Sequence, residues 1–69
     1  MSNAVFLARL ARGDTLVIVR FVQSRTLSRE DLLQLEKFLR LRKDANVALK
    51  TVEQALRRME KEAGNALQS

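Results

Sequence analysis

The pattern of hydrophobic and polar positions predicts helices in the second half of the chain. Residues 28–42 and 46–63 carry leucine, valine and alanine at spacings of three and four, which place side chains on one face of an α-helix. The two apolar stripes are out of phase, because Leu39 and Ala45 are six residues apart where a continuous stripe needs a heptad. The pattern therefore favours two helices joined by a turn, with one long helix over residues 28–63 as the alternative.

Capping signals mark the ends of these helices. Ser28 and Asp31 have the spacing of a capping box at the start of the first helix. Thr51 and the glutamine three residues later have the same spacing, so the second helix could also begin after Thr51. Gly64 is a residue type that commonly ends a helix, and we expect residues 65–69 to form a frayed tail.

Residues 14–22, with the sequence DTLVIVRFV, have a different pattern. Side chains are β-branched or aromatic at six of the eight positions from Thr15 to Val22, which is typical of a β-strand. Apolar residues would lie on both faces of that strand, so both faces need cover, and its backbone groups need a partner strand. We therefore expect one β-strand that pairs with another strand, either within the chain or in a second copy of it.

Residues 2–12 are open to two interpretations. A polar residue at position 2 or 3 would cap a short helix that Gly13 ends. Alternatively, residues 4–11 are a strand that forms a hairpin with the strand after Gly13. The expected fold is a single small domain, mostly α with one β-strand, in which the strand precedes a helical hairpin. We expect an intertwined or strand-paired homodimer.

Composition excludes several classes of function. The chain has no cysteine and no histidine, which removes disulfides, common metal ligands and the usual catalytic bases. We therefore expect no enzyme, no cofactor, no metal site and no small-molecule substrate. No apolar stretch reaches the length of a membrane span, and the N-terminus lacks a signal-peptide pattern. These features predict a cytoplasmic protein without a membrane partner.

Positive charge indicates a binding function. The chain has 13 Lys and Arg against 8 Asp and Glu, for a net charge of +5. Arginine pairs with phosphate and with carboxylate, so nucleic acid and acidic protein surfaces are both suitable partners. The cations that we consider candidates for binding a partner or nucleic acid are Arg20, Arg25, Arg40, Arg42, Lys43, Lys50, Arg57 and Arg58.

Apolar residues outside the main stripes predict an interface. A monomer would leave such side chains exposed to water, whereas a second copy or a partner protein would cover them. The candidates for this dimer or partner surface are Val17, Val19, Phe21, Leu33, Phe38 and Leu41.

The order of elements resembles that of the ribbon-helix-helix repressors. SREDLLQLEKFLRLR (residues 28–42) is similar to their first helix, and TVEQALRRMEKE (residues 51–62) is similar to their second. The resemblance implies that the strands of two chains pair and enter the major groove of DNA. Ribbons of that family expose polar side chains at alternate positions, whereas each face of residues 15–22 offers only one.

In size and character the chain is also similar to small early bacteriophage proteins that bind and disable host regulators, a resemblance that no motif carries. We therefore expect a non-enzymatic homodimer that binds and modulates a protein partner, such as a host transcription regulator. A ribbon-helix-helix DNA-binding repressor is the alternative.

Overall fold

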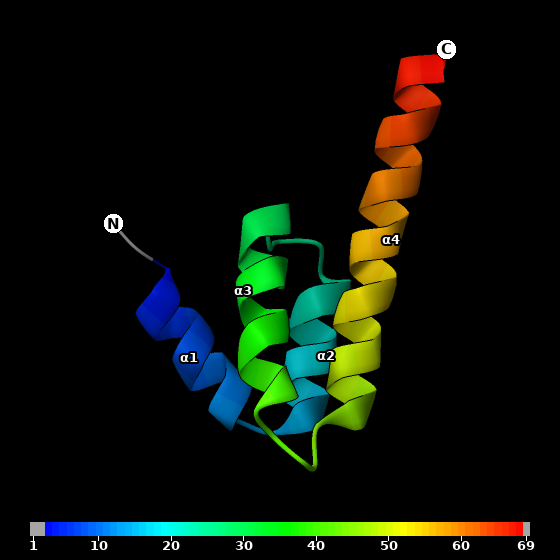
Figure 1. Ribbon diagram of the computed structural model, residues 1–69. Coiled ribbons are helices and arrows are strands. Elements are labelled where there is room, and N and C mark those ends of the chain that lie inside the picture. Colours follow the sequence, from blue (N-terminus) through cyan, green and yellow to red (C-terminus); the bar gives the residue numbers. More distant parts are fainter. Residues whose placement is uncertain (1–2, 69) are drawn as a thin grey trace.

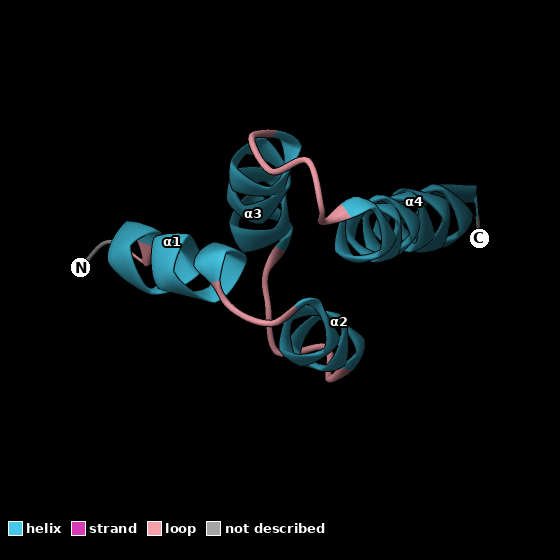
Figure 2. Ribbon diagram, turned by 90° about the horizontal axis from the view of Figure 1, so that it is seen from below, coloured by secondary structure: helices cyan, strands magenta, loops and turns pink. Residues whose placement is uncertain are grey.

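The computed structural model describes residues 3–68, and side chains as far as residue 63. These residues form four α-helices, namely α1 (Ala4–Arg12), α2 (Thr15–Gln23), α3 (Arg29–Arg40) and α4 (Asn46–Gln68). Successive helices run in alternating directions, and α4 extends beyond the other three (Figure 1). Viewed from one end, the helices surround a common interior in which α1 and α4 each contact both α2 and α3 (Figure 2). No helix over the described residues is both long and apolar enough to cross a membrane.

The predicted β-strand at residues 14–22 is wrong, because this segment forms α2. Asp14 caps the helix, and its carboxylate accepts a hydrogen bond from the backbone N–H of Leu16 at 2.9 Å. Helical spacing places Ile18 and Val22 on one face, and both are buried. The lower helix propensity of valine and isoleucine, a few tenths of a kcal/mol per residue, is smaller than the gain from burying this face, about 1.5–3 kcal/mol per side chain.

The corrected fold is all-α over residues 3–68, with no strand. A helix satisfies its own backbone donors and acceptors, so α2 needs no partner strand. Neither the predicted helical hairpin behind a strand nor the strand-paired homodimer describes this arrangement. The hairpin alternative for residues 4–11 is also wrong, since they belong to α1, which ends at Arg12 as the position of Gly13 predicted.

The break between the two predicted helices is confirmed. α3 and α4 are separated by a loop, so the alternative of one helix over residues 28–63 is wrong. The capping box at the start of α3 is also confirmed: Ser28 Oγ accepts from the backbone N–H of Asp31 at 3.2 Å, and Asp31 Oδ2 accepts from that of Ser28 at 3.3 Å. α3 ends at Arg40, two residues before the predicted end.

The predicted end of the second helix is wrong. α4 begins at Asn46, as expected and not after Thr51, but it continues through Gly64 to Gln68. The tail predicted for residues 65–69 is therefore helical at residues 65–68, and residue 69 lies outside the described part. Helix propagation past a single glycine costs only about 1 kcal/mol relative to alanine.

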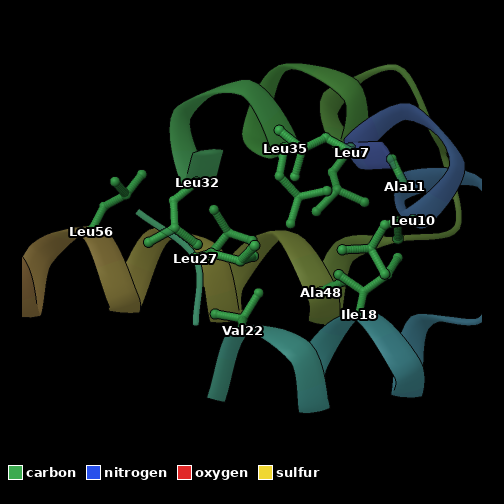
Figure 3. Close-up of a cluster of buried hydrophobic side chains, with 13 residues drawn as sticks. Leu7, Leu10, Ala11, Ile18, Val22, Leu27, Leu32, Leu35, Ala48 and Leu56 are labelled. Atoms are coloured by element: carbon green, nitrogen blue, oxygen red, sulfur yellow. The ribbon is translucent and has the colours of Figure 1, made fainter. Parts of the chain in front are cut away.

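The core is apolar and is formed by this one chain. Figure 3 shows side chains of all four helices directed into the shared interior. No described polar or charged residue is buried there. Its buried members are Leu7, Leu10, Ala11, Ile18, Val22, Leu27, Leu32, Leu35, Leu39, Ala45, Ala48, Val52 and Leu56.

Candidate functional site

Two loops meet at one end of the bundle, and Arg42 joins them. These loops, residues 13–14 and 41–45, lie at the lower end of Figure 1, and we call this end the loop end. Arg42 Nη1 donates to the backbone oxygens of Ala11 at 2.6 Å and Gly13 at 2.8 Å. Arg42 Nε and Nη2 each donate to the carboxylate of Asp44 at 3.1 Å. The α1–α2 loop is thereby connected to the α3–α4 loop through one side chain.

Arg42 is one of the cations predicted to bind a partner, but these contacts within the chain give it a structural role. The hydrogen bonds with Asp44 raise the pKa of Arg42 and lower the pKa of Asp44 below 3.8. A guanidinium that already donates four hydrogen bonds has little capacity left for a phosphate or a partner carboxylate. Arg42 therefore maintains the shape of the loop end, and the residues around it are the ones available for binding.

An apolar pocket of about 280 Å³ opens beside Arg42. Apart from Arg42, the residues that line the pocket belong to α1 and to the end of α3, and most of them are apolar. Leu41 caps α3 and is 83% exposed, an unusual exposure for a leucine beside a pocket. A cavity of about 150 Å³ is enough for benzene, so this pocket can hold a large apolar side chain. The lining residues are Ala8, Ala11, Arg12, Phe38, Leu41 and Arg42.

The charge around this loop-end pocket is positive. Arg12 lines it, and Lys43 lies in the adjoining loop; neither forms an ion pair with any described side chain. Arg40 pairs with Glu36 at 3.6 Å but remains 61% exposed. The two acidic residues of the loop end are engaged, since Asp14 caps α2 and Asp44 pairs with Arg42. The pocket therefore combines an apolar lining with cations at its edge.

The other predicted cations are exposed but lie on different elements. Arg20 is on α2, Arg25 follows α2, and the remaining three, Lys50, Arg57 and Arg58, are on α4. Glu53 and Glu60 alternate with cations along α4, and Glu60 pairs with Arg29 of α3 at 3.7 Å. None of these five cations lines the loop-end pocket.

The predicted apolar surface is divided among three regions of the structure. Phe38 is half-buried in the loop-end pocket together with the exposed Leu41, whereas Leu33 is 39% exposed in a shallow depression between α3 and α4. Of the three residues on α2, Val17 is half-exposed, while Val19 and Phe21 are half-buried against the core. Two of the six predicted interface residues, Phe38 and Leu41, therefore line the loop-end pocket.

Sequence reasoning missed several exposed apolar residues. Phe6 of α1 contacts Phe21 of α2, with ring centroids 5.4 Å apart. Val5, Leu16 and Val47 are each at least 65% exposed. A helical interpretation of residues 15–23, started by Asp14 as N-cap, would have placed Leu16 on the opposite side from Ile18. The strand interpretation assigned both residues to one face.

Two carboxylates that join parts of the fold have lowered pKa values. Asn3 Nδ2 donates to Asp31 Oδ1 at 3.3 Å, and this bond, followed by that from the Ser28 backbone, lowers the pKa of Asp31. Asp44 is affected by Arg42 in the same direction. A lowered folded-state pKa adds stability that is present above the unfolded pKa and is lost as pH falls through the folded value.

We therefore expect acid to destabilise the fold, while stability stays nearly constant from about pH 5 to 8, because the chain has no histidine. Urea denaturation at a series of pH values measures this. The double variant Asp31→Asn, Asp44→Asn is expected to lose less stability than the native chain between about pH 5 and 2.5. A steep change between pH 6 and 7 would contradict this account.

Comparisons with known proteins give no assignment. Neither a scan against protein-family models nor searches of curated proteins and solved structures found a match.

Proposed function

We propose that this chain is a non-enzymatic binding protein that docks on a protein partner through the loop-end pocket. The partner would supply one large apolar side chain, flanked by carboxylates. The observation that carries this proposal is the pocket itself, with Phe38 and Leu41 in its lining, Arg12 at its edge and no carboxylate among its lining residues. An exposed apolar patch with a polar rim is typical of a site that binds another protein.

The two kinds of contact would contribute differently. Burying a leucine or phenylalanine side chain in the pocket supplies about 1.5–3 kcal/mol. Exposed ion pairs at the edge, with Arg12 or Lys43, add about 0–1 kcal/mol each and are screened by salt. The apolar anchor should therefore determine most of the affinity, and the cations should accelerate association with acidic segments.

The alternative of a ribbon-helix-helix repressor has lost its main support. Its mode of DNA binding needs a strand from each of two chains, whereas residues 15–23 are helical. Arg20, the only long polar side chain that such a ribbon could direct at a base edge, lies on the exposed side of α2. A host transcription regulator as the partner stays a prediction.

Homodimerisation also stays a prediction, but it now needs a different kind of interface from the predicted strand pairing. Strand pairing cannot produce it, so a dimer would need to use exposed apolar residues such as Phe6, Leu16 and Val17. Sedimentation equilibrium at micromolar concentration measures the mass directly, for comparison with 7.9 kDa for one chain.

Selection from a displayed library of random peptides tests the proposed function. We expect enrichment of peptides that combine a leucine, phenylalanine or tryptophan with at least two acidic residues. Leu41→Ser should weaken a selected peptide at least tenfold, about 1.4 kcal/mol. The fold should be unaffected, because Leu41 is 83% exposed.

Matched variants distinguish specific binding at the pocket from nonspecific apolar or electrostatic binding elsewhere on the protein. Val47→Ser removes another exposed apolar side chain, 69% exposed, that does not line the pocket. Arg12→Glu and Lys61→Glu make the same charge change at the pocket edge and on α4. We expect only Leu41→Ser and Arg12→Glu to weaken binding. Equal effects of Arg12→Glu and Lys61→Glu would contradict a specific site.

A further inference from the structure

A second pocket, of about 220 Å³, lies on the other side of the core from the loop end, between the end of α2, the α2–α3 linker and α4. Its apolar wall consists of Val22, Leu27, Leu32, Ala55 and Met59. Figure 3 shows the first three of these close to one another beside α4. The unbranched side chain of Met59 can adapt to the shape of a ligand. We call this cavity the α2–α4 pocket.

The polar edge of the α2–α4 pocket contains two arginines, Arg25 and Arg58, and one carboxylate, Glu62. Neither arginine forms an ion pair with a described side chain. The three groups together carry a net charge of +1. A ligand with one negative charge therefore suits this edge, and an apolar part of that ligand suits the wall.

The backbone at Arg25 gives independent support. Arg25 has a φ of 61°, in the left-handed region. It follows the C-cap Ser24, and its N–H donates to the Val22 carbonyl at 3.2 Å. Glycine is the usual residue at such a helix end, because it adopts this conformation without steric strain. Arginine is an uncommon residue at such a position, so its side chain is a candidate for a binding role.

We propose that the α2–α4 pocket binds a monocarboxylate that carries an apolar group about the size of benzene. The carboxylate would lie between the guanidinium groups of Arg25 and Arg58, since paired arginines bind carboxylates through charge-assisted hydrogen bonds. The volume exceeds the roughly 150 Å³ that accommodates benzene. A free arylalkyl carboxylic acid and the C-terminal phenylalanine or leucine of a peptide share this chemistry.

Calorimetric titration with 3-phenylpropanoate tests the proposal, with 3-phenylpropanamide as the uncharged control. We expect saturable binding of the carboxylate and at least tenfold weaker binding of the amide. A tripeptide that ends in phenylalanine, with a free or an amidated C-terminus, forms the second arm. Binding of the free acid indicates a small-molecule ligand, and binding of the free-carboxylate peptide indicates a peptide C-terminus. Either result supports the site. Failure of both, or equal binding of the amides, overturns it.

Arg25→Gly is the most informative variant. If Arg25 serves only the fold, its loss should not change carboxylate binding, whereas a binding role predicts weaker binding by a protein that is more stable. Removal of the strained arginine should raise the melting temperature by a few degrees, while carboxylate binding falls at least fivefold. Arg58→Gln should weaken binding similarly, and Glu62→Gln should strengthen it. Unchanged binding by Arg25→Gly would contradict the proposal. Leu41→Ser, at the loop-end pocket, should leave carboxylate binding unchanged, which keeps this test separate from that of the proposed function.

Discussion

Replacement of Ile18 by aspartate is expected to unfold the protein, whereas the same replacement at Leu16 should leave it folded. Ile18 is fully buried in α2, while Leu16, two residues earlier, is 68% exposed. An unpaired charge in an apolar interior costs about 3–5 kcal/mol. The total stability of a domain is only roughly 0.05–0.15 kcal/mol per residue, so this cost approaches the whole. In addition, an aspartate at position 16 lies in the first turn of α2, where negative charge is favourable.

This pair of variants separates the helix from the strand that residues 14–22 suggested. In a strand, side chains at positions 16 and 18 point to the same face, so both aspartates would have similar effects. In α2 they point in directions about 200° apart. Far-ultraviolet circular dichroism and thermal melting of the two variants measure the difference. Two unfolded variants, or two folded ones, would contradict the helical assignment.

Replacement of Leu35 by alanine should lower the free energy of unfolding by about 2–5 kcal/mol. Leu35 is fully buried, so its loss removes apolar contacts and leaves a cavity in a core that is already small. Leu33→Ala is the control, because Leu33 is on the same helix and 39% exposed. That change should cost less than about 1 kcal/mol. Urea denaturation measures both, and equal costs would mean that α3 does not face the interior as described.

The helix boundaries that depend on local chemistry were predictable. The capping box of Ser28 and Asp31 and the stop at Gly13 use hydrogen bonds within a few residues, so the local sequence is sufficient to identify them. The change of phase between Leu39 and Ala45 likewise identified the break between α3 and α4.

α2 was not predictable from propensity, because its conformation depends on the rest of the fold. β-branched residues prefer strands only weakly, and that preference depends on what covers them. Here α1 and α4 cover the Ile18 face of α2, and this burial outweighs the local preference. The extension of α4 through Gly64 was missed for a different reason, because one glycine costs only about 1 kcal/mol and need not end a helix.

The candidate site was predictable only in part. Phe38, Leu41 and Arg42 were named because they lie outside the apolar stripe or carry charge, and they do line one pocket. The α1 side of that pocket includes Ala8 and Ala11, small residues that carry no signal in the sequence. The bonds from Arg42 to backbone oxygens near Gly13 join residues about 30 positions apart, and residue type alone does not indicate such contacts.

Docking at the loop-end pocket is tested most directly by nuclear magnetic resonance titration of ¹⁵N-labelled protein with an acidic peptide that contains one phenylalanine. We expect the largest amide shifts in the second half of α1, at the end of α3 and in the α3–α4 loop, and we expect Leu41→Ser to reduce them strongly. Shifts confined to the cations of α4 or to the α1–α2 surface around Phe6, or shifts unaffected by Leu41→Ser, would contradict docking at this pocket.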